Sequence, residues 1–300
     1  MPLVEIRDLI KDYGPVRAVD GLSFGVEPGT ITGFLGPNGS GKTTTLRALL
    51  GLLTPTSGSA TIAGRPYREL AAPLREVGAM LEAAANPART ARNHLRILAA
   101  EASVPRTRVD ELLELVELSA AADRRVGGFS LGMRQRLGLA GALIGDPALL
   151  VLDEPSNGLD PEGIRWLRDF LRALTSDGRT ILLSSHVLAE VAQTVDDVVV
   201  ISHGRVVAHA PLDELTSWGG HQVRVRSSQP EALARALRAG GLDASLPDGD
   251  ELTVTGATEH AVAQLAFDSG IVVHGIVADA SSLEDAFFTL TNATAEEALR

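Results

Sequence analysis

Eight consecutive residues near the start of the chain have the types and the spacing that bind phosphate. They are Gly36-Pro37-Asn38-Gly39-Ser40-Gly41-Lys42-Thr43, and they fit the pattern G-x-x-x-x-G-K-[ST] of a phosphate-binding loop. Glycines let the backbone curl until its N–H groups converge on an anion. We expect Lys42 to reach the β- and γ-phosphates of a nucleotide, and the hydroxyl of Thr43 to ligate Mg²⁺.

A second candidate is a pair of carboxylates, Asp153 and Glu154, directly after the apolar run Ala148–Leu152. A continuous apolar run is typical of a central parallel strand, and open α/β sheets bind ligands at the carboxyl ends of their strands. Asp153 can hold Mg²⁺ directly or through water, and Glu154 can polarise an attacking water as a general base. The alternative is that both carboxylates cap the next turn.

Three further side chains are weaker candidates. Ser130 can cap a helix whose first N–H groups then face an anion, although it can equally be an ordinary helix start. Tyr13 can stack on an adenine ring, or it can simply cover a core edge at the end of a strand. His186 follows an apolar strand and can contact a terminal phosphate, or it can be a capping or surface histidine.

Hydrophobic periodicity indicates the elements that must position these groups. Thr30–Leu35 before the loop predicts a buried strand and Thr43–Leu52 after it a helix, which is the context that the loop requires. Residues 90–125 predict a helical insertion within an α/β domain. Further strands are expected at Leu3–Ile6, Val16–Val19, Gly58–Gly64, Val77–Glu82, Thr180–His186 and Asp197–Ser202, and further helices at Ser130–Ile144 and Glu162–Leu174.

Composition limits the classes of protein that fit. The chain has 300 residues, no cysteine and no apolar run of the ~18 residues that a membrane span needs. Its net charge is −11, and residues 211–300 hold 14 acidic and five basic residues, a net charge of −9. An acidic chain with an acidic end is a poor binder of nucleic acid or anionic lipid. We therefore expect a cytosolic protein that reaches a membrane only through a protein partner.

Taken together, residues 1–215 resemble the nucleotide-binding subunit of an ATP-binding cassette (ABC) transporter. The motifs follow one another in the family's order. They are the A-loop aromatic Tyr13, Walker A at Gly36–Thr43, the signature at Ser130–Gln135, Walker B at Leu149–Asp153 with the catalytic Glu154, the D-loop at Ser156–Asp160 and the switch histidine His186.

Two departures from the family pattern point to one branch of it. The signature is normally Leu-Ser-Gly-Gly-Gln, whereas this chain has Phe129-Ser130-Leu131-Gly132-Met133. Glu82 stands where the family usually has the Q-loop glutamine, and a carboxylate there can bind metal through water. Both features are similar to the bacterial drug-resistance branch, which includes the bacitracin-type and anthracycline-type exporter ATPases.

The resemblance implies an α/β fold: a P-loop NTPase (RecA-like) ABC domain with an antiparallel β subdomain and a helical subdomain at about residues 83–145. It implies ATP and Mg²⁺ as ligands, and a head-to-tail homodimer. It also implies a separate ABC-2-type integral membrane permease, with the chain peripheral on the inner face of the cell membrane and no nucleic-acid partner. Its site residues are Glu154, His186 and Lys42 for catalysis; Tyr13, Gly36, Pro37, Asn38, Gly39, Ser40, Gly41, Lys42, Thr43, Thr44, Ser130, Gly132 and Met133 for ATP; and Thr43, Asp153 and Glu82 for metal.

The C-terminal part, residues 216–300, predicts a second domain. Its composition changes near Pro211, and Ser217–Gly220 has the composition of a linker. The β-α-β-α-β-α order favours a small α/β domain of split-βαβ type. We expect it to stabilise a dimer or to have a regulatory role, and the alternative is a passive cap. The expected elements are strands at Gln222–Arg226, Glu251–Val254 and Ile271–Val277, and helices at Pro230–Ala239, Glu259–Asp268 and Ser282–Leu290.

The resemblance implies the function of an ATPase subunit of an exporter, and by analogy with that branch its cargo would be antibiotics or other drugs. The alternative is a cassette ATPase that acts on ribosomes or DNA. Against it stand the single Walker A motif, the short helical insertion and the acidic charge. A P-loop kinase gives no reason for the signature at Ser130 or for His186. The transported substrate is not written in this sequence.

Overall fold

The computed structural model describes residues 2–81, 85–187, 191–218, 222–246 and 248–279. The chain divides into two compact units, Met1–Pro211 and Leu212–Arg300. Each unit is described by itself below. No helix in the described ranges is long and apolar enough to cross a membrane.

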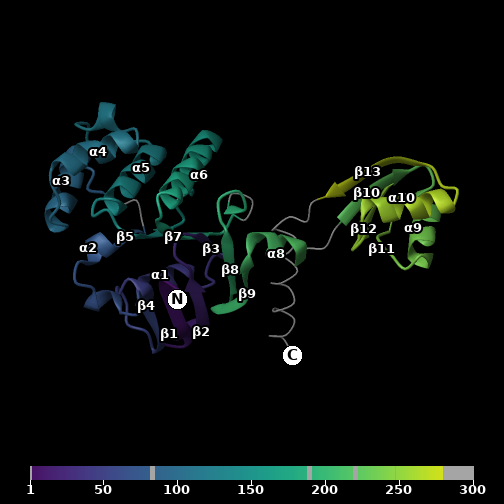
Figure 1. Cartoon of the computed structure of the whole chain (residues 1–300), viewed down its shortest axis with the longest axis horizontal. Helices are drawn as coiled ribbons and strands as arrows, with labels where there is room; N and C mark the ends of the chain where they lie inside the picture. The colour runs from purple at the N-terminus through teal and green to yellow at the C-terminus, as the bar shows by residue number, and fades with distance from the viewer. Residues whose placement is uncertain (1, 82–84, 188–190, 219–221, 247, 280–300) are drawn as a thin grey trace. The chain divides into compact units, whose positions relative to one another are not determined.

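A six-stranded sheet forms the centre of the first unit (Figure 1). Its order is β5-β6-β7-β3-β8-β9, and all neighbours are parallel except β8 and β9, which are antiparallel. Every residue of β3, β6 and β7 is buried, as expected for central parallel strands. The strands are β3 Ile31–Leu35, β5 Val77–Met80, β6 Leu149–Asp153, β7 Thr180–Ser185, β8 Asp197–Ser202 and β9 Arg205–Pro211.

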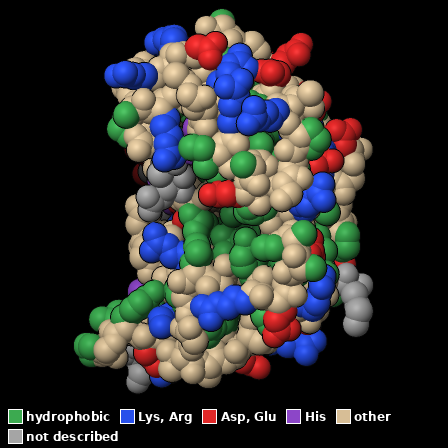
Figure 2. Space-filling view, turned by 90° about the vertical axis from the view of Figure 1, so that its left-hand side faces the viewer, with side chains coloured by type: hydrophobic (Ala, Val, Ile, Leu, Met, Phe, Trp, Pro, Cys, Tyr) green, Lys and Arg blue, Asp and Glu red, His purple; other side chains and the backbone are tan. Residues whose placement is uncertain are grey.

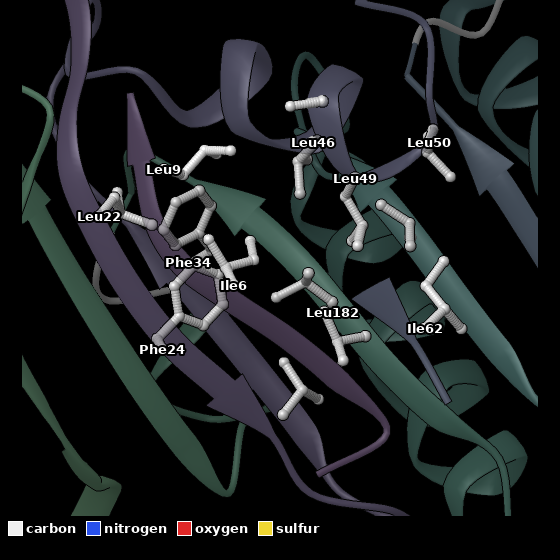
Figure 3. Packing of buried hydrophobic residues seen from close by; sticks show 14 of the residues in the cluster. Ile6, Leu9, Leu22, Phe24, Phe34, Leu46, Leu49, Leu50, Ile62 and Leu182 are labelled. Carbon is white, nitrogen blue, oxygen red and sulfur yellow. The ribbon is translucent and has the colours of Figure 1, made fainter. Parts of the chain in front are cut away.

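A second, antiparallel sheet of order β2-β1-β4 is joined to the first through a shared core. Its strands are β1 Val4–Tyr13, β2 Val16–Val26 and β4 Ser57–Ile62. Figure 3 shows its side chains meeting those of β3, β7 and helix α1 (Lys42–Leu49). Phe24 and Phe34 stack across this core with ring centroids 5.0 Å apart. β1 and β2 are longer than the sequence predicted, because register shifts interrupt the alternation of apolar side chains.

The predicted helical insertion consists of separate helices that cover one edge of the central sheet. α5 (Leu131–Ala142) packs against β5 and against α3 (Ala91–Glu101) and α4 (Thr107–Leu115). Thr90 and Ser130 cap α3 and α5 with their hydroxyl groups. Helix α6 (Pro161–Ser176) follows the carboxyl end of β6. The remaining short elements of the first unit are α2 Pro73–Glu76 and the 3₁₀ turns η1 Tyr67–Glu69, η2 Ser119–Ala121 and η3 Val126–Gly128.

The second unit contains a four-stranded antiparallel sheet of order β11-β12-β10-β13. With its helices it has the predicted split-βαβ arrangement, and its core includes Val223, Val225, Leu233 and Val254. Two details differ from the sequence prediction: Ser217 and Trp218 end helix α8 rather than a linker, and the two-residue strand β11 was missed. The predicted helix at 282–290 lies outside the described residues. The elements are α8 Leu212–Trp218, β10 Gln222–Ser227, α9 Pro230–Ala239, β11 Asp243–Ala244, β12 Glu251–Thr255, α10 Glu259–Asp268 and β13 Val273–Asp279.

Candidate functional site

The phosphate-binding loop connects β3 to α1, and backbone packing fixes its shape. A Cβ added to Gly36 would lie 2.5 Å from the carbonyl oxygen of Ile201 in β8, so a side chain at this position would clash with that strand. Gly41 has φ +106°, and a Cβ there would lie 2.6 Å from the carbonyl oxygen of Ala18. Both positions therefore require glycine, and the loop is pressed between β2 and β8.

Lys42 begins α1 and is buried, with 6% of its surface exposed. Its Nζ donates to the carbonyl oxygens of Gly36 at 2.6 Å and Pro37 at 3.2 Å, and it lies 3.5 Å from Oε1 of Glu154. The ammonium group thus points into the loop rather than into solvent. The Oγ of Ser40 is buried in the same loop without a hydrogen-bond partner among the described residues, so the loop holds unsatisfied hydrogen-bonding capacity that suits a polyanion.

Thr43 and Asp153 meet although they are 110 residues apart. The Oγ1 of Thr43 donates to Oδ2 of Asp153 at 2.7 Å, and the hydroxyl of Ser184 donates to Oδ1. Ser184 lies opposite Asp153 in the parallel register of β6 and β7. Ser184 is not among the site residues predicted from the sequence, and the signal that identifies it is this strand register.

Glu154 has φ +50°, an uncommon conformation for a residue other than glycine. Its backbone N–H is held by Ser184, whose Oγ accepts at 3.0 Å and whose carbonyl oxygen lies at 3.2 Å. Its Oε2 lies 2.7 Å from Nδ1 of His186, which follows β7 and is 36% exposed. The carboxylate therefore stands between the buried ammonium of Lys42 and a half-exposed imidazole, at the carboxyl edge of the sheet.

The other predicted ATP-contacting residues lie in two places. Pro37, Asn38 and Gly39 form the exposed crest of the loop, and Thr44 is half-buried on α1. Tyr13 ends β1 with 51% of its surface exposed, and the Nζ of Lys11 lies 5.1 Å from its ring centroid.

The signature residues line a different cavity of the same unit. Ser130, Gly132 and Met133 face a space of about 430 Å³ between the first turns of α5 and α6. The Oγ of Ser130 accepts a hydrogen bond from the N–H of Met133 at 3.2 Å, which caps α5. Within one chain the structure therefore brings together the Walker A lysine, the acidic pair and His186, and it leaves the signature residues at their own cavity.

The donor set fits Mg²⁺ only in part within the described residues. A threonine hydroxyl and an aspartate carboxylate, from Thr43 and Asp153, are the hard oxygen ligands that Mg²⁺ takes together with nucleotide phosphates and water. The described ranges hold no group of three or more acidic or histidine side chains that could form a metal site by itself. Glu82, the third predicted ligand, lies outside the described residues.

The fold and the loop define a P-loop ATPase, and comparison with known proteins places it in a family. Residues 19–157 match the model of the ABC transporter family. The bacitracin transport ATP-binding protein of Bacillus licheniformis is 44% identical over 220 residues, covering 71% of each chain. The daunorubicin resistance ATP-binding protein of Streptomyces coeruleorubidus is 37% identical over 308 residues, covering 96% of this chain and 94% of the other.

The solved structures agree with this result. The structure of an ATP-binding subunit of an ABC transporter superposes with a TM-score of 0.64 at 29% identity, covering 71% of this chain and 91% of that one. Residues 221–284 match a family model described as a domain of unknown function. The chain belongs to the ABC transporter family, as one of its ATP-binding proteins, and it is an ATPase.

Proposed function

We propose that this protein is the ATP-hydrolysing subunit of an exporter and drives a separate membrane permease, with antibiotics or other drugs as its cargo. The observation that carries this proposal is that five side chains lie in contact at one edge of the sheet. They are Lys42, Thr43, Asp153, Glu154 and His186. The cargo class rests on relatives whose names refer to bacitracin transport and daunorubicin resistance.

The roles of the residues follow from their contacts. The ammonium of Lys42 and the N–H groups of the loop bind the phosphates of ATP. Thr43 and Asp153 would hold Mg²⁺, which when bound would neutralise charge on the transferred phosphoryl group. Glu154 takes a proton from the attacking water, and His186 orients its carboxylate through the 2.7 Å contact.

The placement of the signature supports a homodimer. Ser130, Gly132 and Met133 line their own cavity, so a second copy arranged head to tail can present them to the nucleotide held by Lys42. Nucleotide binding then shifts the pair towards a closed form, because the closed form binds ATP more tightly than the open form does. Glu154→Gln should trap this ATP-bound dimer, and size-exclusion chromatography in saturating Mg-ATP measures it. A monomeric elution volume for that variant would count against the mechanism.

An apolar groove in the first unit is our candidate for the contact with the permease. It has a volume of about 240 Å³ and lies among α2, β5, α3 and α5. Figure 2, which looks at this side of the molecule, shows a hollow in which hydrophobic side chains gather. We infer that a short apolar segment on the cytoplasmic side of an ABC-2-type permease binds there, which would hold the protein at the inner face of the membrane. The groove is lined by Tyr67, Leu74, Val77, Gly78, Ala79, Met80, His94, Leu98, Gly138, Gly141, Ala142 and Ile144.

The test is purification of the tagged protein from native membranes in mild detergent, followed by identification of the chains that come with it. We expect a multi-span membrane protein in stoichiometric amount. Leu74→Asp, which places a charge in the groove, should lose this partner. Leu52→Asp is the matched control, since Leu52 is also exposed but does not line the groove. Ribosomal proteins or DNA in place of a membrane protein would leave only the ATPase assignment standing.

A further inference from the structure

Leu131, the first residue of α5, stands where the usual signature has a glycine, and its side chain makes a specific contact. Its Cδ2 lies over Gly158 so closely that a Cβ added to Gly158 would be only 2.3 Å away. Gly158 also has φ +72°, a backbone conformation that favours glycine. The leucine methyl therefore occupies the space above a glycine that cannot readily be replaced.

Two more contacts join the same two segments. Gln135, one turn further along α5 and 8% exposed, donates from Nε2 to the carbonyl oxygen of Asn157 at 3.5 Å. The side chain of Leu159 packs on the backbone of Gly132, since a Cβ there would lie 3.5 Å from its Cδ2. The first turns of α5 thus hold three successive residues of the loop that precedes α6.

That loop leads directly back to Glu154. The N–H of Asn157 donates to the carbonyl oxygen of Glu154 at 3.1 Å, and Glu154 itself has a positive φ. An unfavourable backbone conformation of this kind persists only when the surrounding structure holds it. Ser184 stabilises this conformation of Glu154 on one side. The loop that contacts α5 stabilises it on the other side.

We propose that Leu131 is a positioning residue for ATP hydrolysis. Through its contact with Gly158 it fixes the loop at residues 155–160 and thereby the carboxylate of Glu154. The inference rests on the proposed function, in which Glu154 takes the proton of the attacking water. It adds that α5, the helix that meets the nucleotide of the second copy, also positions the general base of its own chain through the loop at residues 155–160.

The central test compares Leu131→Gly, which restores the usual signature residue, with the wild type and Leu131→Met. We expect Leu131→Gly to lower kcat roughly tenfold, because small displacements of a catalytic group are costly, while KM for ATP stays unchanged. Leu131→Met keeps a flexible methyl over Gly158 and should retain most of the rate. Leu115→Gly is the matched control, since Leu115 is similarly exposed and ends another helix of the same unit; its kcat should equal that of the wild type.

A double-mutant cycle with Gly158→Ala tests the contact itself. The alanine methyl clashes with Leu131 in the wild type, so Gly158→Ala should lower kcat more in that background than beside Leu131→Gly. Additive effects would overturn the proposed contact. A raised KM, or loss of ATP-induced dimerisation when Leu131→Gly is combined with Glu154→Gln, would assign Leu131 to nucleotide binding instead.

The outcomes separate this inference from the proposed function. If the wild type hydrolyses ATP and Leu131→Gly matches its kcat, the positioning role is wrong and the ATPase function stands. If the purified wild type hydrolyses no ATP, the proposed function is wrong, and this inference, which rests on it, is wrong too.

Discussion

At the scale of single residues, the surroundings of Lys42 determine what can replace it. Its ammonium group is buried between the carbonyl oxygens of Gly36 and Pro37 and the carboxylate of Glu154. A compact point charge fits there, whereas a planar guanidinium does not have the same geometry. We therefore expect Lys42→Arg to lower kcat about a hundredfold or more, almost as strongly as Lys42→Ala. A steady-state ATPase assay measures it.

The chain supplies its own control for Lys42. The only other lysine is Lys11, whose Nζ donates to the carbonyl oxygen of Thr54 at the surface. Lys11→Arg should therefore keep wild-type activity. If Lys42→Arg also kept it, the charge at this position, rather than its compact shape, would be what the loop requires.

A site residue could be predicted from the sequence where it stands in a short, local motif. Lys42, Thr43, Asp153 and Glu154 stand in short motifs whose chemistry can be read directly, and the structure brings their side chains together. Ser184 could not be found in this way. Ser184 and Asp153 are 31 residues apart. Their contact depends on the register of β6 and β7, and an apolar run does not fix register.

At the scale of elements, the cap of α5 allows stability and function to be separated. The Oγ of Ser130 accepts the N–H of Met133, so Ser130→Ala should cost about 1 kcal/mol of stability. Aspartate caps a helix as well as serine does, so Ser130→Asp should unfold at the temperature of the wild type. Its carboxylate would repel the phosphates of the partner's nucleotide.

The measurements for Ser130 are thermal unfolding and the size of each variant in the Glu154→Gln background with Mg-ATP. We expect Ser130→Asp to remain monomeric there although it is stable. A stable dimer of Ser130→Asp would remove Ser130 from the nucleotide contact and leave it as a helix cap only.

Helix α3 carries a histidine that makes stability depend on pH. Burial lowers the pKa of His94, and the positive charge of Arg89 lowers it further. The folded protein therefore keeps His94 neutral at pH values where the unfolded chain, with an ordinary pKa of about 6.5, already binds a proton. The contribution of His94 to stability is fully present above the pKa of the unfolded chain, about 6.5. It is lost as the pH falls below that value and through the lowered pKa of the folded protein.

The prediction is that His94→Gln flattens this acid limb. Thermal midpoints of the wild type and of His94→Gln, measured between pH 8 and pH 5.5, should differ least at the alkaline end. The wild type should lose more stability on acidification. Parallel curves for the two proteins would show that other groups set the dependence.

Element boundaries were predicted well where one pattern runs without interruption. The apolar runs of β3, β6 and β7 are examples. β1 was predicted too short, because a register shift after Ile6 and the positive φ of Asp8 break its alternation. Helix α8 was read partly as a linker, because Gly219 and Gly220 dominate the composition there although a seven-residue helix precedes them.

At the scale of the whole molecule, the division into two units sets the last prediction. The described residues that we propose to bind nucleotide lie within Met1–Pro211, and the second unit has a core of its own. We propose that the second unit stabilises the dimer. A protein that ends at Trp218 should therefore bind ATP as tightly as the full chain, because no residue of the loop or of the acidic pair is removed.

The truncated protein should nevertheless dimerise less. In the Glu154→Gln background with Mg-ATP, the concentration needed for half-dimerisation should rise about tenfold, which corresponds to ~1.4 kcal/mol of lost contact energy. Analytical ultracentrifugation measures the dimer, and titration with a fluorescent ATP analogue measures the nucleotide. Unchanged dimerisation would make the second unit a passive cap. If the proposed division of roles holds, the first unit has its own core and an intact loop and therefore binds ATP alone. Loss of ATP binding with a normal melting transition would instead show that nucleotide binding needs both units.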